Sequence, residues 1–316
     1  MNRRDFLTTS VAGILPNWLL KEEKPPLDDR FNYDVSAFAH TDPALLRYNE
    51  TGHFPTGFRE PKCLAVTGNN ILVGGDRAIK TFDATGKEQA ALTVTALPHA
   101  VAGNSDGMIC VAFQNHFQIF GKLPVTSETF GERADLTGIA VSGENIFVAD
   151  AGNRQVVRCD LTGKIQSRIK GFAVPSPYFD LHAGADDLLW VVNPGKHRIE
   201  AYNPDGTLEL SWGETGMSIE GFCGCCNPVY FTRLADGRFI TSEKGLNRIK
   251  IYSATGKFLG VVAGVEHLVK DLELAKQACT NCQIGFGFPV ACDAANRVFT
   301  LDQTTRDIRI FTPKAA

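Results

Sequence analysis

The densest group of chemically reactive side chains in this sequence is a cysteine-rich segment, GFCGCCNP, at residues 221–228. Together with a C-x-x-C pair further along the chain, it contributes five thiols, at Cys223, Cys225, Cys226, Cys279 and Cys282. Zinc and iron–sulfur clusters are both commonly held by four thiolates, so two such segments offer enough ligands for either. We therefore predict a cysteine-ligated metal or iron–sulfur cofactor, with the nearby Cys292 as a further candidate ligand.

Disulfide bonds between the two segments are the main alternative to a cofactor. Disulfides persist in oxidising compartments, so exported proteins often contain them. A bridge between the adjacent Cys225 and Cys226 would be strained, however, and a large domain needs a covalent staple less than a small one does. The sequence thus favours an iron–sulfur cluster, and zinc or no cofactor at all stays open.

The N-terminus has the features of an export signal. Residues 3–7 read Arg-Arg-Asp-Phe-Leu and precede a moderately apolar run from Val11 to Leu20. This pattern resembles the twin-arginine signal, which directs folded proteins, often with a cofactor already inserted, out of the cytoplasm. We expect residues 1–26 to be a signal and linker, and the mature protein to be periplasmic or on the cell surface. No A-x-A cleavage site follows, so retention as a membrane anchor stays open.

An internal repeat organises the remainder of the chain. Six segments share one pattern, in which a β-rich run, a turn and a second run end near an aromatic residue: ILVGGDRAIKTF (71–82), ICVAFQNHFQIF (109–120), IFVADAGNRQVVRCD (146–160), LWVVNPGKHRIEAY (189–202), FITSEKGLNRIKIY (239–252) and VFTLDQTTRDIRIF (298–311). A repeat of roughly 40–50 residues is typical of one four-stranded propeller blade. Four of the segments continue into turns whose glycines suit a positive φ, namely Gly86, Gly163, Gly206 and Gly256.

The repeat resembles that of the NHL family of six-bladed β-propellers, which reads roughly I-x-V-A-D-x-x-N-x-R-V-Q-x-F. Residues 137–164, TGIAVSGENIFVADAGNRQVVRCDLTGK, match it most closely. The resemblance covers residues 44–316, after a lead at 27–43, and implies an all-β, six-bladed propeller. The FCGCCNP segment is also similar to one in exported bacterial NHL-repeat proteins, which implies a shared local structure and no particular reaction.

Ring closure follows from the order of strands in the repeat. The chain ends just after the third strand of blade six, so the segment RYNETGHF (47–54) is expected to supply the missing outer strand. The cysteine-rich segment then lies in the connection from blade four to blade five. The C-x-x-C pair lies in the next connection, whose first half, EHLVKDLELAKQA, predicts a helical insertion. Both connections should share one face of the ring.

Several other residues have a chemical interpretation. Glu243 and Lys244 fall at a hairpin turn of blade five, beside the cysteines, and predict a surface that docks a protein or redox partner. His99 lies in a segment that resembles one motif of the peptidyl-hydroxyglycine lyases, and His182 is a second inner-strand histidine. The gluconolactonase-like hydrolases hold a divalent metal in the channel, where Asp180, Asp293 and Arg233 are the candidates here.

The remaining three cysteines are predicted to pack in the hydrophobic core, because free cysteine behaves as a small buried hydrophobe. They are Cys63, Cys110 and Cys159, named below the core cysteines. A net charge of −3 over 316 residues provides no basic field of the kind that nucleic-acid binders use. The leading hypothesis is an exported propeller whose cofactor serves electron transfer. A disulfide-stapled binding scaffold and a channel-centred lyase or hydrolase are the alternatives.

Overall fold

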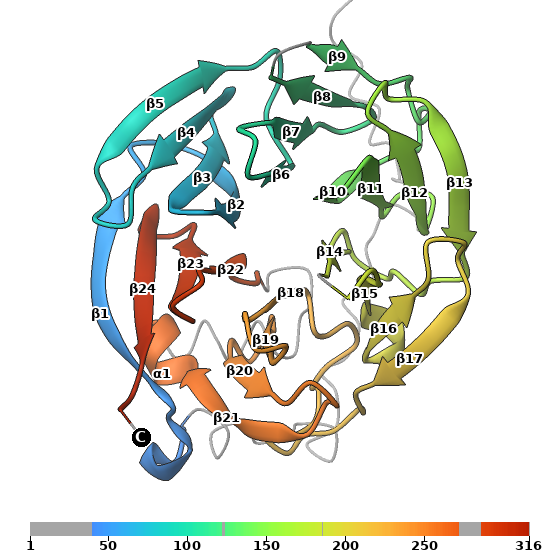
Figure 1. Cartoon of the computed structure of the whole chain (residues 1–316). Helices are drawn as coiled ribbons and strands as arrows, with labels where there is room; N and C mark the ends of the chain where they lie inside the picture. Colours follow the sequence, from blue (N-terminus) through green and yellow to red (C-terminus); the bar gives the residue numbers. More distant parts are fainter. Residues whose placement is uncertain (1–39, 122–123, 185, 272–285, 316) are drawn as a thin grey trace, which may run out of the picture. The chain divides into compact units, whose positions relative to one another are not determined.

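A computed structural model describes residues 40–121, 124–184, 186–271 and 286–315. In these residues, six antiparallel sheets of four strands each are arranged in a ring around a central channel (Figure 1). The predicted six-bladed β-propeller is therefore confirmed. The predicted export signal lies outside the described residues.

The first three blades occupy residues 61–170 in chain order. Blade one contains β2 (Pro61–Thr67), β3 (Asn70–Gly75), β4 (Ala78–Phe82) and β5 (Glu88–Thr93). Blade two contains β6 (Ala100–Gly103), β7 (Ile109–Ala112), β8 (Phe117–Phe120) and β9 (Val125–Thr126). Blade three contains β10 (Leu136–Ser142), β11 (Asn145–Asp150), β12 (Gln155–Asp160) and β13 (Ile165–Lys170).

The last three blades complete the ring. Blade four contains β14 (Leu181–Ala183), β15 (Leu189–Asn193), β16 (Arg198–Tyr202) and β17 (Leu208–Trp212). Blade five contains β18 (Tyr230–Arg233), β19 (Phe239–Ser242), β20 (Ile249–Tyr252) and β21 (Phe258–Ala263). Blade six contains β22 (Val290–Cys292), β23 (Val298–Asp302), β24 (Asp307–Pro313) and β1 (Tyr48–Pro55). Short 3-10 turns lie at Pro43–Leu45 and Pro194–Lys196.

The N-terminal strand closes the ring as predicted. β1 pairs antiparallel with β24, from Tyr48 opposite Pro313 to Pro55 opposite Asp307. Just before it, the backbone N–H of Arg47 donates to the carbonyl of Val261 in blade five at 2.8 Å. The closing segment therefore covers the outer edge of blade six and also contacts its neighbour, which removes an exposed edge.

The hydrophobic core lies between the blades. The second strand of a blade is covered on both faces by adjacent blades, and for this reason β15 and β23 are buried at every position. The outer strand β13, in contrast, alternates between exposed and partly buried residues, as expected where one face meets water. The four turn glycines have φ between 81° and 94°, which confirms the predicted conformation.

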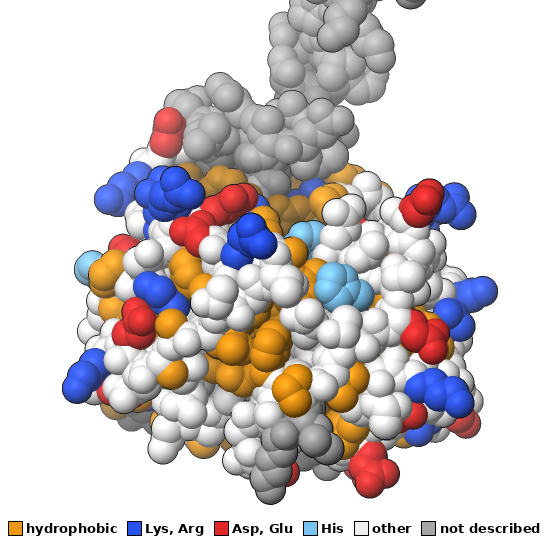
Figure 2. Space-filling view, turned by 90° about the horizontal axis from the view of Figure 1, so that it is seen from above, with side chains coloured by type: hydrophobic (Ala, Val, Ile, Leu, Met, Phe, Trp, Pro, Cys, Tyr) orange, Lys and Arg blue, Asp and Glu red, His pale blue; other side chains and the backbone are white. Residues whose placement is uncertain are grey.

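The helical insertion is only partly tested. One helical turn, α1 (Val265–Leu268), begins where the insertion was predicted. The helix ends at Leu268, and residues 269–271 of the predicted segment are not helical. Residues 272–278 lie outside the described part of the chain, so a helix there stays a prediction. Within the described residues, no helix has the length and apolar character of a membrane span. Figure 2 shows basic and acidic side chains interspersed over the described part of one face.

Candidate functional site

The cysteine-rich segment forms the connection between β17 of blade four and β18 of blade five, as predicted. The Sγ atoms of Cys225 and Cys226 are 3.3 Å apart. Cys225 is exposed, whereas Cys223 and Cys226 are buried. The Sγ of Cys226 also lies 3.3 Å from the hydroxyl of Ser176. Residues 219–227 of this connection are named the cysteine loop below.

The spacing of the two adjacent sulfurs has a chemical meaning. It is well beyond the covalent S–S length of about 2.05 Å, so Cys225 and Cys226 are not bridged to each other. Two thiolates on one tetrahedral metal with bonds of about 2.3 Å would be roughly 3.8 Å apart. A separation of 3.3 Å can therefore reach metal-ligand spacing with a shift of about half an ångström.

Two anchors fix the cysteine loop. The side chain of Phe222 is fully buried and packs near the rings of Trp212 and Tyr252. The side-chain amide of Asn227 donates to the carbonyls of Cys223 at 2.6 Å and Lys244 at 2.9 Å. The backbone N–H of Lys244 donates back to the Asn227 amide oxygen at 2.9 Å. The loop is thus tied to the β19–β20 hairpin of blade five.

A buried ionic network lies directly beneath the loop. The carboxylate of Glu243 contacts the Arg248 guanidinium at 2.6 Å and the Lys250 ammonium at 3.2 Å. It also accepts the backbone N–H of Cys223 at 3.3 Å. The Lys250 ammonium donates to the carbonyls of Ile219 at 3.1 Å and Gly221 at 2.7 Å. The network therefore connects blade five to Ile219 and Gly221, just before Cys223, as well as to Cys223 itself.

Burial changes the acid–base properties of this network. Burial lowers the pKa of Lys250 to about 8, although the Glu243 carboxylate opposes the shift. Burial also acts to lower the pKa of Arg248, but charge attraction and hydrogen bonding with Glu243 outweigh it and raise that pKa. Both groups therefore carry positive charge at neutral pH.

Glu243 and Lys244, which were predicted to belong to a face that docks a partner, are both buried. Glu243 is 1% exposed and Lys244 is 5% exposed. Glu243 pairs with the two cations, and the Lys244 ammonium lies 5.1 Å from the centre of the Tyr178 ring. The hairpin is polar because it binds the cysteine loop. Sequence reasoning also missed Arg248 and Lys250. The available signal was the place of Lys250 among the apolar residues of β20, with Arg248 directly before that strand.

The structure brings together some of the predicted cysteines and separates one. Cys292 lies at the end of β22, where its Sγ donates to the carbonyl of Arg233 at 2.7 Å. Arg233 ends β18, whereas Cys226 precedes the start of that strand. Cys292 therefore lies at the opposite end of β18 from the cysteine loop, which makes it a poor candidate ligand.

The second cysteine segment cannot be placed in the same way. Cys279 and Cys282 lie outside the described residues. In the part of the chain that the structure describes, no group of three or more His, Cys, Asp or Glu side chains is arranged to hold a metal ion. The described residues alone therefore do not form a metal site.

The core cysteines are buried in β2, β7 and β12, as predicted. Desolvation raises the pKa of each of their thiols to about 12. Thiols with such pKa values are almost fully protonated at neutral pH and react slowly. The core cysteines therefore belong to the packing of the blades.

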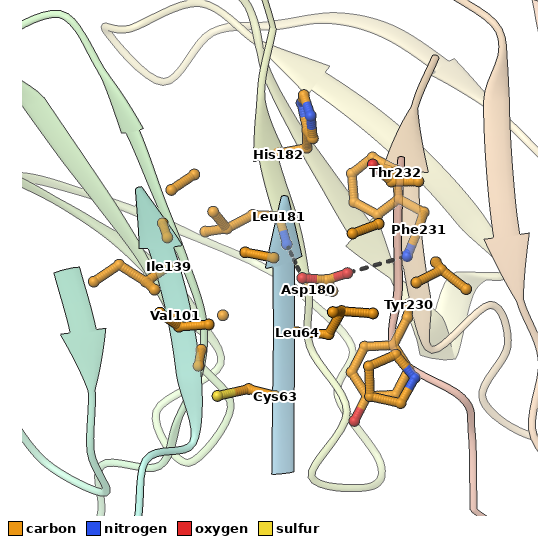
Figure 3. Close-up of a pocket in the computed structure, with 18 of the residues that line it drawn as sticks. Cys63, Leu64, Val101, Ile139, Asp180, Leu181, His182, Tyr230, Phe231 and Thr232 are labelled. Atoms are coloured by element: carbon orange, nitrogen blue, oxygen red, sulfur yellow. Dashed lines mark hydrogen bonds between the residues drawn. The ribbon is translucent and has the colours of Figure 1, made fainter. Parts of the chain in front are cut away.

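The central channel contains a second candidate site. A cavity of about 270 Å³ is lined by the inner strands of all six blades. Figure 3 shows Asp180 within it, accepting the backbone N–H of Phe231 at 3.0 Å and that of Leu181 at 2.9 Å. Burial raises the pKa of Asp180 to about 7 in spite of these two hydrogen bonds. Burial lowers the pKa of His182, two residues further along in β14, to about 4.

His99 and Arg233 line the same cavity as Asp180, but each pairs with another residue, and Asp293 is not part of the lining. His99 lies 3.3 Å from Asp135. Asp293 pairs with Arg297 at 2.7 Å in the turn after β22, and Arg233 pairs with Asp186 at 2.7 Å. The predicted hydrolase constellation of Asp180, Asp293 and Arg233 is therefore divided among separate contacts.

Asp180 has a structural role that explains its position. The channel-facing edge of an inner strand has no neighbouring strand, so its polar groups need other partners. Asp180 of blade four binds an N–H of blade five, Thr137 of blade three donates to the carbonyl of Phe179, and Cys292 of blade six donates to blade five. These side chains join consecutive inner strands and strengthen the channel wall.

Comparison with known proteins identifies the fold. No protein-family model matches the chain, and no curated protein matches it. A crystal structure of virginiamycin B lyase from Staphylococcus aureus is 13% identical with a TM-score of 0.57, over 84% of this chain and 100% of that one. A streptogramin B lyase structure is 14% identical with a TM-score of 0.59, over 86% and 100%.

A third similar structure is a protein of unknown function from Bacteroides caccae, at 17% identity and a TM-score of 0.55 over 66% of this chain and 82% of that one. Identities this low show a shared propeller fold and carry no activity over to this chain.

Proposed function

We propose that the chain is a propeller that holds a thiolate-bound metal or iron–sulfur cluster at the cysteine loop. The observation that carries this proposal is the pair of sulfurs of Cys225 and Cys226, 3.3 Å apart on a loop fixed by the buried Glu243 network. A loop that needed only to connect two blades would not require a buried carboxylate and two buried cations beneath it.

The ligands in this proposal come from two connections. Cys223, Cys225 and Cys226 lie on the cysteine loop, and Cys279 and Cys282 are the sequence-predicted partners. The side-chain amide of Asn247, in blade five, donates to the carbonyl of Phe286 at 2.6 Å. Cys282 precedes Phe286 by four residues in the sequence, so the connection that carries the second cysteine pair ends against the hairpin that holds the first.

The proposed role is electron transfer or redox-partner binding in an exported protein. A site near the surface suits exchange with a partner, and Cys225 is exposed. The N-terminal twin-arginine pattern supports export of a protein that folds around its cofactor first. An alternative with the same cysteines is a cofactor-free scaffold in which they form disulfides.

The test is elemental and sulfide analysis of the full chain purified without oxygen. We expect a bound metal, and for an iron–sulfur cluster also acid-labile sulfide and a visible charge-transfer spectrum. The Cys225→Ser/Cys226→Ser double variant should lose the metal, whereas the core variant Cys110→Ala should retain it. The contrary result is a wild-type protein that contains no metal and whose cysteines react with a thiol reagent only after a reductant is added. That result would show that the cysteines form disulfides and hold no cofactor.

A further inference from the structure

The second strand of a blade carries an acid at its last position in blades three and six and directly after its last position in blade five. In blade three, Asp150 binds neutral donors: the N–H groups of Asp135 and Asn153 at 3.1 Å each and the side-chain amides of Asn153 and Gln155 at 2.7 and 3.1 Å. In blade three the carboxylate therefore caps a turn, because it can accept hydrogen bonds from several N–H groups that have no backbone partner.

Blade six keeps most of this arrangement. Asp302 accepts the N–H groups of Thr304 and Thr305 at 3.0 and 3.1 Å. The Arg309 guanidinium lies 3.7 Å away and pairs more closely, at 2.6 Å, with the partly exposed Glu50. The one nearby cation thus has its own carboxylate.

Blade five departs from this pattern in charge. Its acid, Glu243, faces two cations, Arg248 and Lys250, which are 1% and 0% exposed. Among the described residues, Glu243 is the only carboxylate that forms an ion pair with either cation. One buried positive charge is therefore left without a described counter-ion, and a buried ion of this kind is destabilising by several kcal/mol unless a negative group compensates for it.

The unmatched charge is close to the cysteine loop. Nη2 of Arg248 is buried and has no hydrogen-bond partner among the residues that the structure describes. Lys250 contacts the carbonyls of Ile219 and Gly221 and lies 4.6 Å from the centre of the Phe222 ring, directly before Cys223. Glu243 accepts the N–H of Cys223 itself. The excess charge and the thiols thus share one buried region.

We propose that Arg248 and Lys250 are the counter-charges of an anionic, thiolate-ligated metal site at the cysteine loop. This inference rests on the proposed function, because thiolates that bind a metal supply the negative charge. The cysteine loop carries three thiols, and three thiolates around one Zn²⁺ leave a net charge of −1, which the one unmatched buried positive charge can offset. The two side chains act as positioning and charge-compensating residues and do not themselves bind the metal.

The test is a Co²⁺ titration of the reduced, metal-free full chain, in which thiolate-to-cobalt absorption reports binding. We expect Arg248→Met and Lys250→Met each to weaken Co²⁺ binding by about 10–100-fold, the usual range for residues that support metal ligands. Arg248→Lys keeps the charge but loses the shape of the guanidinium, and it should bind Co²⁺ within about threefold of wild type. The control is Arg309→Met, which removes the corresponding cation of blade six and should leave binding unchanged.

The outcomes separate the two proposals. Thiolate-to-cobalt absorption in the wild type, with loss in both Met variants and rescue by Arg248→Lys, supports charge compensation. If Arg248→Met and Arg248→Lys weaken Co²⁺ binding equally, the shape of the guanidinium matters and its charge does not. That result would overturn the charge-compensation inference and leave the proposed function standing. Absence of thiolate-to-cobalt absorption in the wild type would overturn the proposed function and this inference with it. If Arg248→Met does not fold, Lys250→Met answers the same question.

Discussion

The most informative single change in this protein is Glu243→Gln. The substitution keeps the size of the side chain and an oxygen that can accept the N–H of Cys223, but it removes the only carboxylate that the structure pairs with Arg248 and Lys250. Two buried cations, at 1% and 0% exposure, are then left side by side without a carboxylate partner in the described part of the chain. The change therefore tests whether the network beneath the cysteine loop depends on charge.

The expected loss of stability is large. Removing one partner of a buried ion pair typically destabilises a protein by about 3–5 kcal/mol. For a domain of about 270 residues this corresponds to a fall in Tm of roughly 5–9 °C. Urea and thermal unfolding, followed by circular dichroism, measure both quantities. Adding Lys250→Met to Glu243→Gln should recover part of the loss, because it removes one of the two stranded charges.

A matched control separates burial from charge loss. Glu60→Gln breaks the ion pair of Glu60 with Lys62, whose side chains are 59% and 37% exposed. Exposed pairs of this kind contribute up to about 1 kcal/mol. If Glu243→Gln destabilises the protein no more than Glu60→Gln does, the buried network does not have the energetic role assigned to it here.

Three further predictions concern other parts of the propeller. The core cysteines should resist alkylation in the native protein at pH 8 and react after denaturation, as measured by mass spectrometry, because a pKa of about 12 leaves about 10⁻⁴ of each thiol ionised. Asp180 has a folded-state pKa of about 7, above its ordinary 3.8, so the folded protein holds the extra proton between these values. The stability of wild type relative to Asp180→Asn should therefore fall as pH rises from 4 to 7, by up to about 4 kcal/mol; a difference in urea unfolding that is independent of pH would contradict this. Phe54→Ala, in the closing strand, should destabilise the protein by about 3–5 kcal/mol in the same unfolding assay, because the Phe54 ring is buried 5.1 Å from that of Phe82; a loss below about 1 kcal/mol would show that closure by β1 contributes little.

The fold could be predicted from the sequence because the repeat specifies it several times. Each blade combines a β-rich hairpin with a turn, and four of these turns contain a glycine at positive φ. The same count of strands left one outer position empty, which the segment at Tyr48–Pro55 fills. Errors in reading any one blade are corrected by the others.

The chemistry of the site was only partly predictable. The cysteine loop could be assigned to a connection between blades, but sequence alone could not show that Glu243 and Lys244 point inward. Charged residues at a hairpin turn are usually solvated, and their burial depends on the loop that packs on them from blade four. Cys292 was placed near the loop by its position in the chain, whereas its strand places it at the other end of the channel.

X-ray absorption at the metal edge of the purified full chain tests the central claim most directly. The account predicts a bound metal with a first shell of sulfur ligands at about 2.3 Å, which disappears in the Cys225→Ser/Cys226→Ser variant. A first shell of nitrogen and oxygen, or a protein that binds no metal in reduced form, would contradict it.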